Sequence, residues 1–245
     1  MILNICLILL IIIVAYLIGS LNASIIISKF LFKKDVRKFY SKNAGATNIK
    51  RMFGFKWGLI VFFLDAFKPA LAMFFAFIIS LIFKHQKINF YIYVFFVSLG
   101  HTFPIFFKFR GGKNVSCVIG TSFIFNIFYF LILALIFWTI YFWKHYISLA
   151  SIMAMLVLGI VCWIPFISNI SNYSFDNHLY QSNYFLYFNL LHNFSNKDFF
   201  DYLLWINITL DLCIILSISL HYANIKRLFS HKEKKFFLCY NKNKK

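Results

Sequence analysis

The stretch FKFRGGKNVSCVIGTSFIF, residues 107–125, decides how this chain is organised in space. Its first part places three basic residues, Lys108, Arg110 and Lys113, around a pair of glycines. Its second part contains a short apolar run, VIGTSFIF (118–125). A full bilayer crossing needs about 20 apolar residues, so this run alone is too short for an ordinary one. Whether it forms a helix determines which ends of the other apolar segments meet.

The composition of the chain indicates a membrane protein. Of its 245 residues 62% are hydrophobic and only 13% are charged, whereas soluble domains are about half apolar and a quarter charged. Residues 2–28 carry no charge and lack the basic start of a signal peptide, so we predict a retained transmembrane helix. The five cysteines show no metal-ligand spacing, and we expect neither a disulfide framework nor a metal site.

Charge is distributed unevenly along the chain. Lys and Arg gather in 29–56, 108–113 and 226–245, and the positive-inside rule places all three stretches in the cytoplasm. The long apolar segments lie at about 2–28, 57–83, 90–107, 127–143, 148–168 and 202–220. Between Lys113 and His221 only three of them occur, and an odd number would put these residues on opposite sides. We therefore predict that 118–125 forms a short extra helix ending near Asn126.

The predicted fold is an all-α integral membrane protein with about seven transmembrane helices, one of them short. The N-terminus is then outside and the C-terminus inside. We expect a single transmembrane domain over residues 1–245, with 169–201 as an external insertion and 234–245 as a basic cytoplasmic tail.

Three polar stretches could hold an anion. In GHTFPIFFKFRGGKNVS, Gly111 and Gly112 allow backbone N–H groups to approach a phosphate, while Arg110 and Lys113 supply positive charge. The spacing of a Walker loop is absent. The alternative for this stretch is a glycine turn with cations that reach the membrane interface.

The second stretch, DVRKFYSKNAGATNIKR (35–51), is rich in small polar side chains. These are Ser41, Asn43, Thr47 and Asn48, followed by Arg51. Ser41 or Thr47 could cap a helix, but a loop that binds a polyanion accounts for more of the cluster. The third stretch, HYANIKRLFSHKE (221–233), places His221 and Asn224 on one side of a helix together with Arg227 or Lys226.

Two ionisable sites fall inside apolar segments. Asp65 and Lys68 are spaced i, i+3, and we expect them to pair within the bundle. Asp211 has no obvious local partner. The cytoplasmic stretches contain neither paired carboxylates nor a GxSxG elbow, so an enzyme of this sequence would bind phosphates well and have little general-base machinery.

Taken in chain order, the three stretches resemble the PlsY family of bacterial acyl-phosphate:glycerol-3-phosphate acyltransferases. The matching motifs are SKNAGATNIKR, GHTFPIFFKFRGGKN and HYANIKRLFSHKE. The resemblance implies a multi-pass protein of the bacterial plasma membrane with its active site at the cytoplasmic face. It implies transfer of a fatty acyl group from acyl phosphate to the sn-1 hydroxyl of glycerol 3-phosphate, without cofactor, metal or nucleic acid. The enzyme that makes acyl phosphate would be a candidate for docking.

The resemblance also assigns roles to residues. The expected catalytic residues are Ser41, Arg51, Lys113, His221 and Asn224. Those expected to bind substrate phosphate are Asn43, Thr47, Asn48, Gly111, Gly112, Arg110 and Arg227. Those expected to support the site are His101, Glu233, Asp65 and Lys68, with Glu233 paired to an Arg or Lys.

The chain departs from the family pattern at a few positions. Glycines of the family are replaced at Tyr40, Lys42, Asn114 and His231, a proline at Asn22 and a glutamate at Ala223. We expect positive φ at Tyr40 and Lys42, where side chains are disfavoured. The alternative function is a transporter of a small phosphorylated or anionic solute, which predicts polar residues along a path through the bilayer.

Overall fold

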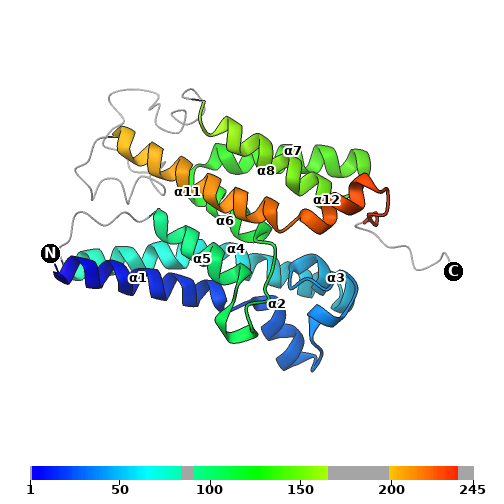
Figure 1. Ribbon diagram of the computed structural model, residues 1–245, viewed down its shortest axis with the longest axis horizontal. Helices are drawn as coiled ribbons and strands as arrows, with labels where there is room; N and C mark the ends of the chain where they lie inside the picture. The colour runs from blue at the N-terminus through cyan, green and yellow to red at the C-terminus, as the bar shows by residue number, and fades with distance from the viewer. Residues whose placement is uncertain (1, 84–90, 165–198, 237–245) are drawn as a thin grey trace.

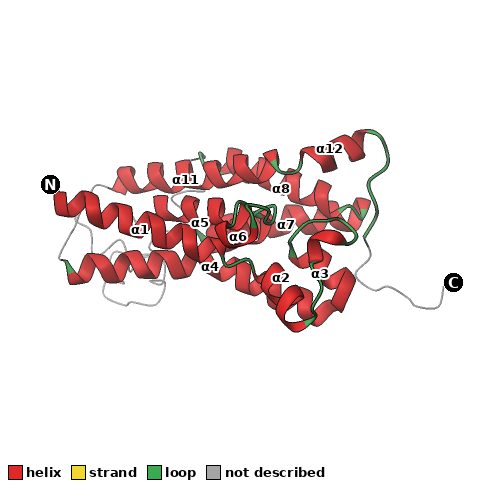
Figure 2. Cartoon of the chain, turned by 60° about the horizontal axis from the view of Figure 1, so that its bottom comes forward, coloured by secondary structure: helices red, strands yellow, loops and turns green. Residues whose placement is uncertain are grey.

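The computed structural model describes residues 2–83, 91–164 and 199–236, and every regular element in these ranges is helical (Figure 2). Three helices are long and apolar enough to cross a membrane: α1 (Ile2–Ser20), α4 (Phe55–Ile82) and α7 (Ile127–Lys144). Helices α11 (Phe199–Ser219) and α12 (Tyr222–Phe229) meet at a bend of 55° and make a fourth if they form one span. The predicted all-helical membrane fold is confirmed.

Three shorter apolar helices accompany them: α5 (Ile92–Thr102), α6 (Val115–Phe125) and α8 (Ile147–Val161). The short helix expected at 118–125 is α6. It stops before Asn126, whose side chain accepts a hydrogen bond from the Phe128 N–H (2.9 Å) and thereby starts α7. The total of seven transmembrane helices stays a prediction. So does the orientation with the N-terminus outside the cell and the C-terminus in the cytoplasm.

The first apolar segment contains a helix long enough to span a membrane, but this helix ends at Ser20 and does not continue to residue 28 as predicted. Asn22 leaves the helical conformation (φ −66°, ψ 107°), and its side chain accepts from the Ile25 N–H at 3.1 Å. This cap begins α2 (Ala23–Ile26), which runs into a π-helical turn, η1 (Ile27–Leu31). Asn22 thus performs a capping role at the position where the family has proline.

Close backbone contact joins the first and fifth helices. A Cβ added at Gly19 would lie 2.1 Å from the Val97 carbonyl oxygen, and one at Gly100 would lie 2.1 Å from that of Tyr16. Small residues at such positions let apolar helices approach closely where the hydrophobic effect gives little drive. Helix α4 packs similarly on α6, and α7 on α8, around a continuous apolar core.

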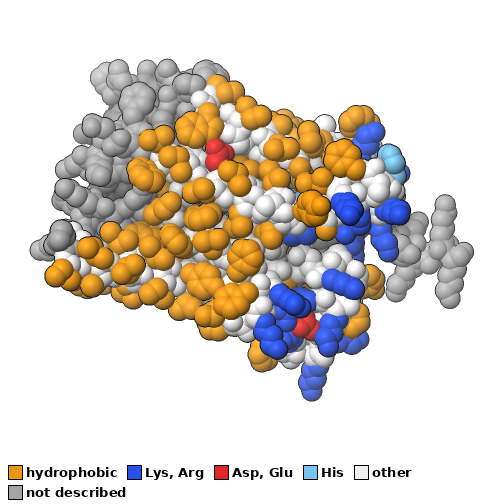
Figure 3. Space-filling view, viewed as in Figure 1, with side chains coloured by type: hydrophobic (Ala, Val, Ile, Leu, Met, Phe, Trp, Pro, Cys, Tyr) orange, Lys and Arg blue, Asp and Glu red, His pale blue; other side chains and the backbone are white. Residues whose placement is uncertain are grey.

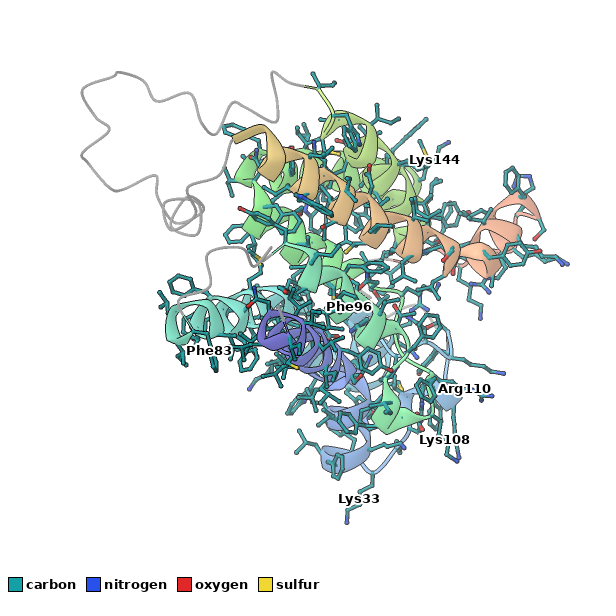
Figure 4. The ribbon with its side chains drawn as sticks, turned by 60° about the vertical axis from the view of Figure 1, so that its left-hand side comes forward. Lys33, Phe83, Phe96, Lys108, Arg110 and Lys144 are labelled. Carbon is teal, nitrogen blue, oxygen red and sulfur yellow. The ribbon has the colours of Figure 1, made fainter. Side chains whose placement is uncertain are left out.

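The long helices run along the longest axis of the molecule, with α2, α3 (Ala46–Phe53) and α12 gathered at one end (Figure 1). Lys and Arg side chains concentrate at this end, while hydrophobic side chains cover the flank (Figure 3). Lys33, Lys108 and Arg110 project from it (Figure 4). The described parts of the three basic stretches therefore lie at one end, as predicted. Residues 165–198 and 237–245, which contain most of the predicted insertion and tail, lie outside the described residues.

Candidate active site

The loop between the first helices and α3 is organised by its own polar side chains. It contains a 3-10 turn, η2 (Val36–Lys38), begun by Asp35. The Asn48 amide nitrogen, in a buried side chain, lies 3.0–3.1 Å from the carbonyl oxygens of Val36, Phe39 and Asn43, and its oxygen lies 3.5 Å from the Ser41 nitrogen. Asn48, predicted to bind phosphate, thus holds the loop that presents the exposed Ser41. Neither Ser41 nor Thr47 caps α3; Gly45 occupies that position.

Arg37 joins this loop to the glycine-containing one. Its guanidinium binds both carboxylate oxygens of Asp35 (3.0 and 2.8 Å) and donates to the carbonyl oxygens of Phe107 (2.8 Å) and Arg110 (3.0 Å). Hydrogen bonding by Arg37 lowers the pKa of Asp35 to about 2, so the pair is ionised at neutral pH. The Arg110 side chain itself is exposed.

The two glycines connect the loop to the end of α5 through their backbone N–H groups. The N–H of Gly111 donates to the Thr102 carbonyl (3.0 Å), and that of Gly112 donates to the His101 carbonyl (3.2 Å). Both donors are thus bonded to carbonyl groups at the end of α5, and phosphate binding by these two glycines stays a prediction. Glycine is required at position 112 because a Cβ there would lie 2.2 Å from Nε2 of the His101 ring and 2.7 Å from the Ala44 carbonyl oxygen.

Behind this loop lies a buried charged cluster. Lys68 Nζ is 2.6 Å from Asp65 Oδ1, which confirms the predicted pair, and His101 Nδ1 is 3.6 Å from the same oxygen. All three side chains are buried. His101 therefore lies between Gly112, whose N–H donates to its carbonyl, and the Asp65 carboxylate.

The stretch 221–233 meets the glycine-containing loop through the side-chain amide of Asn224. The Lys113 ammonium donates to the Asn224 side-chain oxygen, and the Asn224 nitrogen donates to Glu233 Oε1 at 2.7 Å. Glu233 also accepts from Arg227 Nε (2.7 Å) and from Ser148 Oγ (2.7 Å). The expected pairing of Glu233 with an Arg or Lys is confirmed, and the predicted shared face of Asn224 and Arg227 is confirmed because both reach one carboxylate.

Burial governs the protonation of these groups. It lowers the pKa of Lys113 to about 8; the charge of Arg227 adds to this effect and that of Glu233 opposes it. Burial alone would raise the pKa of Glu233, but hydrogen bonds from Ser148, Arg227 and Asn224 outweigh it, so the net shift is downward. Glu233 is therefore a carboxylate, while Lys113 is a cation at neutral pH that loses its proton near pH 8.

His221 lies at the junction of α11 and α12. Its Nδ1 is 2.8 Å from the Ser217 carbonyl oxygen, and Ser217 Oγ donates to the Lys113 carbonyl at 2.7 Å. Since a carbonyl oxygen only accepts, Nδ1 carries the proton and the neutral ring keeps Nε2 as an acceptor. His221 is buried, and burial together with the positive charge of Lys113 lowers its pKa.

Arg51 approaches the same group of residues from α3. Burial lowers the pKa of its guanidinium, an effect opposed by the negative charge of Glu233. Its Cζ lies 5.3 Å from the centre of the Phe236 ring. Lys113, Asn224, Arg227 and Glu233 are thus brought together with Arg51 nearby, whereas Ser41 and Arg110 lie on the exposed rim.

The resemblance to the family predicts glycine at four positions where this chain has another residue, and all four adopt positive φ. The angles are 45° at Tyr40, 55° at Lys42, 66° at Asn114 and 55° at His231. The expectation for Tyr40 and Lys42 is confirmed. The loops keep the backbone conformation that glycine permits although the side chains have changed.

Sequence analysis missed several residues that hold the site. Arg37 and Ser148 were not singled out, although an Asp-x-Arg next to a polar loop and a Ser in the first turn of a helix are both common hydrogen-bonding positions. Asp211, which had no predicted partner, accepts a hydrogen bond from Trp163 Nε1 at 2.6 Å. This contact joins α11 to the end of α8, away from the basic end.

Taken together, cations and amides lie at the rim of an apolar helix bundle. Such an arrangement suits a ligand that combines a phosphate group with a long alkyl chain, because the charges attract the phosphate and the apolar helices accept the chain. The only carboxylate in the group, Glu233, is occupied by three donors, so the described residues offer positioning and charge more than a strong base.

Comparison with known proteins gives a consistent result. The family model described as glycerol-3-phosphate acyltransferase matches residues 9–231. The glycerol-3-phosphate acyltransferase of Mycoplasmopsis synoviae (strain 53) is 36% identical over 226 residues, which cover 91% of both chains. That of Mesoplasma florum is 32% identical over 245 residues, covering 93% of this chain and 94% of the relative.

Solved structures are also similar. The crystal structure of PlsY (YgiH), an integral membrane glycerol 3-phosphate acyltransferase, in its glycerol 3-phosphate form superimposes with a TM-score of 0.66 and 28% identity. The match covers 94% of this chain and 96% of that one. The lysophosphatidic acid form of the same enzyme gives a TM-score of 0.65.

Proposed function

The chain belongs to the glycerol-3-phosphate acyltransferase family, and we propose that it transfers a fatty acyl group from acyl phosphate to the sn-1 hydroxyl of glycerol 3-phosphate. The products are lysophosphatidic acid and inorganic phosphate. The reaction takes place in the bacterial plasma membrane, with the site at the cytoplasmic end of the bundle. The enzyme that makes acyl phosphate is a candidate to dock at this basic end.

The observation that carries the proposal is the meeting of Lys113 with Asn224, next to Glu233 and Arg227, at the rim of the apolar bundle. Both proposed substrates carry phosphate and one carries a long alkyl chain, so both need positive charge beside apolar surface. Asn224 accepts from Lys113 without neutralising it, and the ammonium keeps its full charge for a substrate anion.

In the proposed reaction the hydroxyl oxygen attacks the acyl carbonyl carbon. A new carbon–oxygen ester bond forms, the bond between the carbonyl carbon and the phosphate oxygen breaks, and phosphate leaves. The hydroxyl proton passes to a phosphate oxygen of the substrates, which agrees with the shortage of a protein base. Acyl phosphate is an activated donor, so positioning and charge stabilisation supply most of what the protein must add.

The residues take distinct roles in this scheme. Lys113 and Arg51 stabilise phosphate charge, Ser41 and Asn43 lie on the loop that receives it, and Thr47 lies in the first turn of α3 beside that loop. Asn224 and His221 orient the reacting groups. Arg227 and Glu233 keep Asn224 in place, and Gly111 and Gly112 shape the loop.

The test is an assay of the purified protein with palmitoyl phosphate and radiolabelled glycerol 3-phosphate. Palmitoyl-CoA serves as the control donor and Lys113→Ala as the inactive variant. We expect lysophosphatidic acid from palmitoyl phosphate only, with a loss of at least about 100-fold in the variant. Product from palmitoyl-CoA would refute the donor, and no product from either would favour transport of an anionic solute.

A further inference from the structure

Phe236 lies three residues beyond the last of the three motifs, yet both of its backbone groups are held. Its N–H donates to the His145 carbonyl at 2.8 Å, and its carbonyl accepts from the Tyr141 hydroxyl at 3.0 Å. Its side chain is 8% exposed and packs against Tyr141 and Ala150. The chain after α12 is therefore fixed to the ends of α7 and α8.

The same ring also contacts α3, which belongs to the other side of the site. Arg51 Cζ lies 5.3 Å from its centre and Lys50 Nζ lies 4.6 Å from it. Lys50 is additionally placed 5.0 Å from the ring of Phe55. The Phe236 ring thus joins α3 to α7 and α8. One of its contacts on α3 is Arg51, the side chain expected to bind substrate phosphate.

An arginine next to a phosphate site needs to be held in one orientation. A guanidinium stacked on an aromatic face is attracted to the ring electrons and loses much of its side-chain freedom before the ligand arrives. Its edge N–H groups stay available, because stacking uses the face of the plane. A ligand that binds such a group does not have to order it.

We propose that Phe236 is a positioning residue, whose ring holds the Arg51 guanidinium ready for a substrate phosphate. This inference rests on the proposed function, since it takes Arg51 as a phosphate ligand. It adds a residue outside the three motifs and assigns a role to the segment that follows them.

The test compares Phe236→Leu, which keeps apolar volume without an aromatic face, with Phe236→Tyr and Phe236→Trp, which keep the face. KM and kcat are measured for glycerol 3-phosphate and for palmitoyl phosphate, and the Kd of glycerol 3-phosphate is measured by calorimetry. Arg51→Lys identifies which of the two substrates depends on Arg51. Tyr141→Phe is the matched control, because it removes a bond to the Phe236 backbone and leaves the ring.

Arg51→Lys identifies the substrate whose KM depends on Arg51. For that substrate we expect Phe236→Leu to raise KM by about five- to thirty-fold, with kcat changed by less than about twofold. The Tyr and Trp variants and the Tyr141→Phe control stay within about threefold of the parent protein. In an Arg51→Lys background, Phe236→Leu then has less than about a twofold effect, because the partner is already altered.

Equal losses in the Leu, Tyr and Trp variants, or full additivity with Arg51→Lys, would overturn the inference and leave Phe236 as a space-filling residue. If the parent protein binds glycerol 3-phosphate but does not transfer the acyl group, the proposed function fails, and the Kd values decide the role of Phe236. If it binds neither phosphate compound, both proposals are refuted.

Discussion

The side-chain nitrogen of Asn224 lies 2.7 Å from Glu233 Oε1, and this bond decides which way the Asn224 amide faces. A carboxylate can only accept, so the nitrogen points to Glu233 and the amide oxygen points to Lys113. The Lys113 ammonium is thereby held by a neutral oxygen. Asn224 separates Glu233 from the Lys113 ammonium, so the carboxylate does not pair directly with this positive charge.

The first prediction concerns Asn224→Asp. This change replaces the donor to Glu233 by an oxygen and places a second negative charge beside Lys113. We expect kcat/KM to fall by about 100-fold, equivalent to about 2–3 kcal/mol, since a charge-assisted bond is lost and the ammonium is neutralised. Ser148→Ala removes one donor to Glu233 and is the milder control. An Asn224→Asp enzyme with a third of parental kcat/KM would contradict this role.

The second prediction concerns pH. The pKa of Lys113 is about 8, so its ammonium loses the proton as pH rises through that value. A phosphate monoester is already a dianion above about pH 6, so only the protein charge changes. We expect the Kd of glycerol 3-phosphate to be flat below pH 8 and to rise toward tenfold per unit above it. Calorimetry between pH 7 and 9.5 measures this.

Lys113→Arg is the control for the pH profile, because a guanidinium stays charged throughout this range. A profile that keeps its rise in this variant would assign the titration to another group. Stability moves in the opposite sense: the folded pKa lies below the ordinary lysine value of 10.5, so the unfolded chain holds this proton more tightly. The ligand-free protein therefore gains stability as pH rises from about 8 to 10.5.

The third prediction concerns backbone strain. Tyr40 and Lys42 adopt φ of 45° and 55°, which costs a side-chain-bearing residue about 1–2 kcal/mol. Replacing either with glycine relieves this cost and adds some freedom to the unfolded chain, so we expect a net gain of about 0.5–1 kcal/mol. Thermal unfolding in detergent measures it. Lys38→Gly, in the helical turn η2, is the control and should be destabilising.

Part of the fold and of the candidate site could be predicted from the sequence, including the positive φ values at Tyr40 and Lys42. The polar stretches, their common end and the short helix before Asn126 follow from charge and segment length, because the spans must alternate in direction. The Asp65–Lys68 pair follows from helical spacing. These features depend on local pattern alone.

The remaining features depend on contacts between distant segments. The use of the Gly111 and Gly112 N–H groups is set by the end of α5, and no property of the loop itself indicates it. The same is true of Arg37, which binds carbonyls about 70 residues away, and of Phe236. The break at Asn22 was missed because apolar composition continues through a capped helix start.

The fourth prediction concerns Gly112→Ala. The added methyl group would lie 2.2 Å from His101 Nε2 and 2.7 Å from the Ala44 oxygen, so both the buried ring and the neighbouring loop would have to move. We expect kcat/KM to fall by at least about 100-fold, since displacements of about 1 Å are this costly to positioning. Gly159→Ala, whose methyl would lie 3.1 Å from Asp211 Oδ1, is the control and should retain activity. Comparable losses in both variants would point to general misfolding.

The last prediction concerns the buried ion pair beneath the loop. Asp65 is 1% exposed and lies 2.6 Å from Lys68 Nζ, so removing the ammonium alone leaves a carboxylate with only His101 beside it. We expect Lys68→Met to destabilise the protein by about 3–5 kcal/mol, because an uncompensated buried charge is costly. This corresponds to a fall in melting temperature of about 10 °C for a protein of this size. The double variant Asp65→Asn with Lys68→Met removes both charges and should recover most of the loss, as measured by thermal unfolding in detergent. If the double variant melts no higher than Lys68→Met alone, packing rather than charge determines the stability of this site.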